Sequence, residues 1–274
     1  MWLVKFLTGV LVIYVGIVAL VYLLQNRMLF PTQIASANTS PSSNAEALDI
    51  LELASEEGVL LKGVYVRGED DGGNEPPLVL GFGGNAWNAQ VAAEYLNSLF
   101  PRHDIVVFHY RGYSPSTGKP SAAKLRADSL VVFDHLQSQF GPRPVVGVGF
   151  SIGSGVASYL AANRELKGLI LVSPFDSLKE LASQHFPWLP VRWLFRHEME
   201  AGKDLSGLSI PVAVLAAEHD QVVYPQRTEA LRQIAENMVL DITIRNADHN
   251  DIYGRPEFQA AMIEAMTAVS TADR

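Results

Sequence analysis

From residue 48 onward, short apolar segments alternate with helix-like segments, and this alternation restricts the fold more than any other feature of the chain. The apolar segments are nearly continuous, which is typical of strands buried on both faces of a parallel sheet. The segments between them have the length of helices that connect such strands. We therefore expect strands at Leu48–Ala54, Leu60–Val66, Leu78–Phe82, Ile105–His109, Val145–Phe150, Leu169–Val172, Val212–Ala216 and Leu240–Ile244, and helices at Ala89–Leu99, Ser121–Gln139, Gly153–Asn163, Gln226–Glu236 and Pro256–Val269.

This order predicts an α/β fold with a mostly parallel central sheet of about eight strands and helices on both of its faces. The first two strands are joined only by the turn Glu56–Gly58, so the sheet is expected to begin with an antiparallel pair. The alternation is interrupted between residues 178 and 208, where Trp188 and Trp193 lie in an aromatic-rich segment. This segment is expected to form a minimal helical cap.

The N-terminus carries an uncharged segment between Lys5 and Arg27. Its apolar part, Phe6–Leu24, would span about 28 Å as a helix, which is close to the thickness of a bilayer core. Helices of soluble proteins usually have a polar stripe, and this segment has none, so a buried helix of a globular domain is not expected. We expect residues 1–27 to form a transmembrane anchor, residues 28–47 a linker rich in Ser, Asn and Pro, and residues 48–274 the folded domain.

A cleaved signal peptide is the alternative interpretation of the N-terminal segment. Signal peptides have a shorter apolar region, of about 7–15 residues, with a small-residue cleavage site directly after it. The sequence Ala35-Ser36-Ala37 resembles such a site but lies well beyond Leu24. The length and the spacing therefore favour an uncleaved anchor.

The charges that flank the anchor bear on its orientation. Lys5 and the terminal amine precede the apolar segment, and Arg27 follows it. By this difference of one charge, the positive-inside rule favours the N-terminus in the cytosol. The chain is thus expected to be a single-pass membrane protein; a non-cytosolic main domain is favoured, and the opposite orientation stays open.

Composition argues against several classes of function. The formal net charge is −8, and no basic cluster is present, so nucleic-acid binding is not expected. The chain has no cysteine, which excludes disulfides, thiolate metal sites and cysteine nucleophiles. Asp104 and His109 could be taken for a metal pair, but no His-x-x-x-His motif supplies further ligands. We expect neither a metal nor an organic cofactor.

The sequence Gly149-Phe150-Ser151-Ile152-Gly153 is a G-x-S-x-G motif, which by itself is weak evidence. Its context makes it informative, because an apolar strand runs directly into Ser151 and a helix of small residues follows directly. This is the strand–turn–helix arrangement of a nucleophile elbow, in which the two glycines avoid clashes at a tight turn. We predict that Ser151 is a catalytic nucleophile.

A serine nucleophile needs a histidine base, which is itself oriented by a carboxylate. In enzymes with a nucleophile elbow the acid and then the histidine follow the serine, each on a loop after a late strand. Asp220 and His249 meet this description, and Glu218 is the rival acid. The other six histidines are expected to be surface, loop or packing residues.

An oxyanion hole would complete such a site with two N–H donors. Ile152, which follows the nucleophile, supplies the first donor by its position. The loop Gly83–Ala86 follows an early strand, and its Asn85 is the candidate for the second donor. The alternative is that the two glycines of this loop merely form a turn.

From about Gln25 to Val269 the chain resembles the small α/β-hydrolase-domain proteins that have an N-terminal membrane anchor and almost no cap. The resemblance is carried by the motifs Phe82–Ala86, Tyr110–Ser114 with Gly118–Ser121, Gly149–Gly153, Ser173–Phe175, Asp220–Val223 and Asp248–Asp251. It implies an α/β-hydrolase fold with Ser151 as nucleophile, Asp220 as acid and His249 as base. The family usually has His-Gly-Asn in the first loop, whereas this chain has Gly83-Gly84-Asn85, which puts the local support of that loop in question.

These observations together predict a serine hydrolase that cleaves a carboxylic ester, or a thioester or amide, through an acyl-enzyme. The aromatic cap and the anchor suggest a small-molecule or lipid-like acyl substrate at a membrane. One alternative is a serine peptidase of the same fold, and another is a catalytically weak, membrane-tethered interaction module. Arg111 could bind an anionic substrate group, but we expect it to tie down its own turn by hydrogen bonds.

Overall fold

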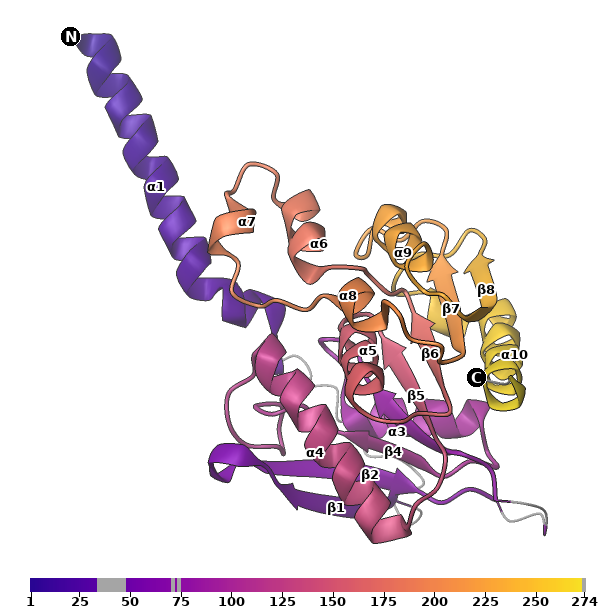
Figure 1. The fold of residues 1–274 in the computed structure, drawn as a ribbon. Coiled ribbons are helices and arrows are strands. Elements are labelled where there is room, and N and C mark those ends of the chain that lie inside the picture. Colours follow the sequence, from indigo (N-terminus) through magenta and orange to yellow (C-terminus); the bar gives the residue numbers. More distant parts are fainter. Residues whose placement is uncertain (34–47, 70–71, 73–74, 273–274) are drawn as a thin grey trace.

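A computed structural model describes residues 1–33, 48–69, 72 and 75–272, and its core is an eight-stranded sheet (Figure 1). The strands lie in the order β1-β2-β4-β3-β5-β6-β7-β8. Their bounds are β1 Leu48–Ala54, β2 Leu60–Val66, β3 Leu78–Phe82, β4 Ile105–Phe108, β5 Val145–Phe150, β6 Gly168–Val172, β7 Val212–Ala217 and β8 Met238–Ile244. The α-helices are α1 Trp2–Leu29, α3 Ala89–Leu99, α4 Ala122–Phe140, α5 Ile152–Asn163, α6 Leu178–His185, α7 Val191–Leu194, α8 Ala201–Leu205, α9 Pro225–Arg232 and α10 Pro256–Thr271, with 3-10 turns at Glu56–Gly58 and Ile252–Gly254.

The sheet confirms the predicted α/β architecture. Strands β1 and β2 pair antiparallel, β2 pairs antiparallel with β4, and all the other neighbours are parallel. Each predicted strand is present, although β4 ends at Phe108 and His109 lies just beyond it. Helix α9 ends at Arg232 instead of the predicted Glu236, because the chain must leave the helix in time to enter β8, which begins two residues before its predicted start.

Helices cover both faces of the sheet, and the alternation of side chains along each strand divides the core in two. In β6, for example, Leu169 and Leu171 join the core on the α4 and α5 side, whereas Ile170 and Val172 join the core on the α3 and α10 side. Figure 1 shows these two layers of helices on opposite faces. Because the strands are buried on both faces, they appear in the sequence as continuous apolar segments.

The segment between β6 and β7 forms the short helices α6, α7 and α8, as expected for a minimal cap. Helix α8 packs on α5, which follows the elbow, and α6 and α7 pack against each other. Helix α7 lies beside the C-terminal half of α1 (Figure 1). The cap therefore connects the centre of the sheet to the N-terminal helix.

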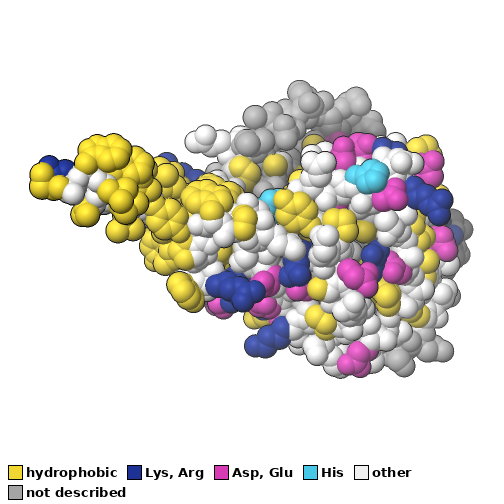
Figure 2. Space-filling view, turned by 90° about the horizontal axis from the view of Figure 1, so that it is seen from above, with side chains coloured by type: hydrophobic (Ala, Val, Ile, Leu, Met, Phe, Trp, Pro, Cys, Tyr) yellow, Lys and Arg dark blue, Asp and Glu magenta, His cyan; other side chains and the backbone are white. Residues whose placement is uncertain are grey.

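Helix α1 projects away from the domain and is apolar enough and long enough to cross a membrane (Figures 1 and 2). It continues to Leu29, beyond the predicted end of the anchor, and the side chain of Phe30 is buried in the core. The ring of Phe30 contacts that of His197 edge to face at 5.3 Å. The chain is thus packed on the domain within residues predicted to be linker, and residues 34–47 of the predicted linker lie outside the described residues.

A buried ion pair joins the loop after β4 to helix α4. The guanidinium of Arg111 binds the carboxylate of Asp128 through two hydrogen bonds, Nε to Oδ2 at 2.7 Å and Nη2 to Oδ1 at 2.5 Å. The hydroxyl of Ser55 donates to the same carboxylate at 2.6 Å. Arg111 is therefore bound within the fold, as expected of a residue that ties down its turn.

The Asp128→Asn substitution should lower the free energy of unfolding by about 3–5 kcal/mol, because it leaves a buried guanidinium without its counter-charge. Asp134→Asn is the matched control: Asp134 binds Arg164 through the same two-bond geometry, but the pair is at the surface. We expect the control to cost less than about 1 kcal/mol. Urea unfolding of the full chain in detergent measures both, and equal losses would contradict the assignment of a structural role to the buried pair.

Candidate active site

Ser151 stands at the tight turn between β5 and α5. Its backbone has φ 52° and ψ −116°, a left-handed conformation that a non-glycine residue adopts only when its surroundings enforce it. The turn is fixed by the N–H of Ser151, which donates to the carbonyl of Val172 at the end of β6 at 2.9 Å. The strained turn places a half-buried serine at the carboxyl edge of the sheet, as in a nucleophile elbow.

The two glycines of the motif allow this turn to pack closely. A Cβ on Gly149 would lie 2.6 Å from the carbonyl oxygen of Gly153, and a Cβ on Gly153 would overlap the carbonyl oxygen of Phe82. Both neighbours are backbone atoms, which cannot rotate away as a side chain could. The start of α5 is therefore pressed against the end of β3, where the loop with Asn85 begins.

Asp220 and His249 are brought together from two different loops. Asp220 follows β7 and His249 follows β8, and both side chains are almost fully buried. Oδ2 of Asp220 lies 2.7 Å from Nδ1 of His249, and Oδ1 accepts hydrogen bonds from the N–H groups of Val222 and Val223 at 2.9 and 2.7 Å. Because an ionised carboxylate only accepts hydrogen bonds, Nδ1 of His249 donates this bond, and in the neutral imidazole Nε2 is therefore the atom with the free lone pair.

Glu218, the rival acid, has a different partner. Its Oε2 accepts a hydrogen bond at 2.7 Å from the N–H of Asn246, and its side chain is largely exposed. This contact joins the loops after β7 and β8 but does not reach the imidazole of His249.

Among the described residues the hydroxyl of Ser151 makes no hydrogen bond, so the structure joins the acid to the histidine but not the histidine to the serine. Such bonds are often long in an enzyme without substrate.

Two tyrosines support the loop that contains Asn85. The hydroxyl of Tyr110 donates to the carbonyl of Gly83, and the hydroxyl of Tyr113 donates to the carbonyl of Asn85, each at 2.8 Å. In the described part of the chain, the N–H groups of Asn85 and Ile152 donate to no protein acceptor. Both tyrosines lie in the Tyr110–Ser114 motif, but their support of this loop was not predicted from the sequence; their hydrogen bonds hold the backbone on both sides of Gly84.

An aromatic cluster holds the three site loops together. Phe150, directly before Ser151, stacks on Trp87 with ring centroids 4.8 Å apart, and Tyr253, four residues after His249, contacts Trp87 at 4.9 Å. Burial raises the pKa of Tyr253, and the negative charge of Asp220 raises it further, which keeps the phenol neutral. Sequence reasoning missed this cluster because its members are far apart in the chain and lack a common motif.

The remaining candidates lie outside the site. Burial lowers the pKa of His109 to about 4, so this histidine is neutral at physiological pH. Asp104 binds Arg143 through Nη1 at 2.7 Å instead of sharing a site with His109. Within the described ranges, no group of three or more His, Asp and Glu side chains could hold a metal ion.

Comparison with known proteins agrees with this architecture. Residues 77–198 match the sequence profile of the alpha/beta hydrolase fold. An uncharacterized protein of Mycobacterium tuberculosis is 30% identical over 242 residues, which make up 86% of this chain and 84% of that protein. The zebrafish (Danio rerio) lysophosphatidylserine lipase ABHD12 is 32% identical over 151 residues, or 48% of this chain, and the match spans only 40% of the lipase.

Solved structures show the same fold at lower sequence identity. An alpha-beta hydrolase from Vibrio vulnificus superimposes with a TM-score of 0.67 at 18% identity, covering 87% of this chain and 92% of that one. A membrane phospholipase A, described as a bacterial virulence factor, superimposes with a TM-score of 0.62 at 17% identity. That match covers 98% of this chain and 99% of the other.

The Gly153→Ala substitution should destabilise the protein by about 1–3 kcal/mol, because the new Cβ would overlap the carbonyl of Phe82. Helix propensity alone would favour alanine by up to about 1 kcal/mol, so the expected sign is opposite to that of propensity. Gly254→Ala is the control, since its Cβ would meet no atom within 4 Å. Thermal unfolding of both variants compares them, and a neutral or stabilising Gly153→Ala would contradict the close packing of the elbow.

Proposed function

Since the chain belongs to the α/β-hydrolase fold family, we propose that it is a serine hydrolase that cleaves carboxylic esters through an acyl-enzyme on Ser151. The observation that carries the proposal is the bond between Asp220 and His249. The carboxylate is held by two backbone N–H groups and in turn orients the imidazole, with Nε2 left available as a base. The strained Ser151 lies on the same carboxyl edge of the sheet, at the end of β5.

The first step forms a bond between Oγ of Ser151 and the carbonyl carbon of the ester. A serine hydroxyl is a weak nucleophile, so Nε2 of His249 accepts its proton as the bond forms. The imidazolium that results is stabilised by the carboxylate of Asp220. The carbonyl oxygen becomes an oxyanion, and the N–H groups of Asn85 and Ile152 are the donors we assign to it.

The second step restores the enzyme. The imidazolium of His249 returns its proton to the leaving alcohol as the ester C–O bond breaks, which leaves the acyl group on Ser151. Water then attacks the acyl carbon as Nε2 of His249 accepts one of its protons. The bond between the acyl carbon and Oγ of Ser151 breaks, His249 returns the proton to Oγ, and the carboxylic acid is released. Besides the ester and water, this chemistry uses side chains and backbone N–H groups of the chain.

We further propose that the ester belongs to a lipid-like molecule and that α1 anchors the enzyme to a membrane in a single pass. Helix α1 has the length and the apolar surface of a membrane-spanning helix. A relative that matches about half of this chain is described as a lysophosphatidylserine lipase. An enzyme held at a membrane meets such substrates at a high local concentration.

The Ser151→Ala variant should lose labelling by a fluorophosphonate probe and nearly all hydrolysis of a p-nitrophenyl ester series, because no other group supplies the attacking oxygen. Ser173→Ala is a matched control: Ser173 also has a left-handed backbone, with φ 45°, and it follows the neighbouring strand β6. The control should keep labelling and activity. Unlabelled parent protein, or labelling that persists in Ser151→Ala, would exclude Ser151 as the nucleophile.

The Asp220→Asn variant should lower kcat by orders of magnitude, since loss of the orienting carboxylate costs about 10⁴-fold in serine proteases. Glu218→Gln should leave kcat nearly unchanged, because Glu218 contacts Asn246 and not His249. Steady-state kinetics on one soluble ester measures both variants. If Glu218→Gln lowered kcat by orders of magnitude and Asp220→Asn left it nearly unchanged, Glu218 would be the acid instead of Asp220.

A further inference from the structure

The cap is bound to α1 by a buried glutamine. We define the cap apex as residues 186–195, which lie between α6 and the return toward α8. Nε2 of Gln25 donates to the carbonyl of Leu194 at 3.3 Å, and its Oε1 accepts from the N–H of Arg196 at 2.9 Å. Gln25 is the buried residue of α1, so this amide fixes the base of the cap apex against the helix.

A second contact lies farther along the helix toward its N-terminus. The hydroxyl of Tyr14 donates to the carbonyl of Trp188 at 2.9 Å. Tyr14 and Gln25 are about 16 Å apart along an α-helix that rises 1.5 Å per residue. The cap apex therefore runs beside α1 for much of the length of the C-terminal half of this helix, as Figure 1 also shows.

This contact determines how deep the cap apex must lie if α1 crosses a membrane. The helix beyond the cap apex, Trp2–Ile13, is only about 18 Å long, whereas a bilayer core is about 30 Å thick. The uncharged segment between Lys5 and Arg27 has about the required length, and it includes both contacts with the cap apex. Helix α1 thus cannot span the hydrocarbon layer unless the cap apex is immersed in it.

The surface of the cap apex suits a lipid environment. Trp188 is 52% exposed and Trp193 is 87% exposed, which is unusual for tryptophan on a soluble domain. Arg192, the one basic residue of α7, is exposed, but its charge is paired with Oε2 of Glu180 on α6 at 2.9 Å. Exposed tryptophans are typical of protein segments at the lipid–water boundary.

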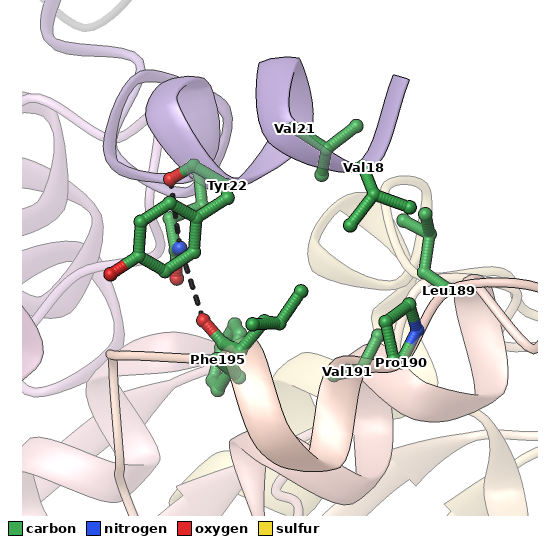
Figure 3. Close-up of a pocket in the computed structure, with 9 residues that line it drawn as sticks. Val18, Val21, Tyr22, Leu189, Pro190, Val191 and Phe195 are labelled. Carbon is green, nitrogen blue, oxygen red and sulfur yellow. Dashed lines mark hydrogen bonds between the residues drawn. The ribbon is translucent and has the colours of Figure 1, made fainter. Parts of the chain in front are cut away.

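A small apolar groove separates α1 from the cap apex. In Figure 3, Val18 and Val21 of α1 face Leu189, Pro190 and Val191 of the cap apex across this groove. Its walls continue the apolar surface of α1, which Figure 2 shows along the projecting helix. A groove of this kind at membrane depth is in contact with lipid chains instead of water.

We propose that the cap apex enters the bilayer beside α1 and that an acyl chain of a membrane phospholipid fills the groove between them. The inference rests on the membrane attachment proposed above, but not on the proposed chemistry. It makes α1 and the cap apex one composite membrane-binding element, which is joined to the domain at the C-terminal end of α1 and at both ends of the cap apex. Lipid can then approach the cap from the side within the membrane.

The absence of cysteine allows single positions to be labelled without background. Full-length Trp188→Cys, Leu189→Cys, Leu11→Cys and Ile263→Cys variants would carry a fluorescent probe and be reconstituted in phosphatidylcholine vesicles with a fraction of lipid bearing a nitroxide on its acyl chain. Trp188 and Ile263 are equally exposed, at 52%, but Ile263 lies on α10. Leu11, on the part of α1 beyond the cap apex, reports membrane insertion of the helix. Hydrolysis of a soluble ester by each variant is measured in parallel.

We expect quenching at positions 188 and 189 to approach that at position 11 and to exceed that at position 263 by at least about threefold, as for a segment within the acyl region. Quenching at position 11 alone would overturn the proposal while leaving the anchor in place. Quenching at 11 and 188 without 189 would overturn the lipid-filled groove. No quenching at any position would overturn both the proposal and the membrane attachment, whereas ester hydrolysis reports separately on the proposed chemistry. Trp193→Cys repeats the measurement without altering the residue whose carbonyl binds Tyr14.

Discussion

The close approach of helix α5 to the end of strand β3 governs the arrangement of the whole site. Gly153 lies against the carbonyl of Phe82, so that the helix after the nucleophile and the loop with Asn85 share one contact. The same contact requires a sharp turn at Ser151, whose backbone has the left-handed φ of 52°. A change in this packing would therefore move the serine and the proposed oxyanion donors together.

The other loops of the site are held by contacts of a different kind. The carboxylate of Asp220 is fixed by two backbone N–H groups of its own loop, and it orients the imidazole of His249 through a single hydrogen bond. The stacking of Trp87 on Phe150 and its contact with Tyr253 join the loops after β3, β5 and β8. The stacked rings lie close to the carboxylate of Asp220, whose charge raises the pKa of Tyr253, and apolar surroundings strengthen electrostatic interactions there.

Much of the fold was predictable from the sequence because burial on both faces makes each strand a continuous apolar segment. The strand ends were less predictable: β8 begins at Met238 instead of Leu240, because Met238 pairs with Val212 across an irregularity in the register of β7 and β8. The pairing of Asp220 with His249 followed the order of the loops, but Glu218 could be set aside only when its bond to Asn246 was seen. The support from Tyr110 and Tyr113 depends on tertiary contacts with a loop about thirty residues earlier, which no local pattern reveals.

The topology connects the proposed membrane element to the chemistry. The cap is inserted between β6 and β7, and Asp220 follows β7 directly, while β6 ends beside Ser151. Figure 1 shows that these parallel strands point toward the side of the molecule from which α1 projects. Because α1 is also packed on the domain through Phe30, the helix and the cap are attached at separate points. Two attachments restrict rotation of the domain about the helix axis, whereas a single flexible tether would not. In the proposed membrane-bound state, these two attachments would keep the carboxyl edge of the sheet, with the candidate active site, facing the membrane.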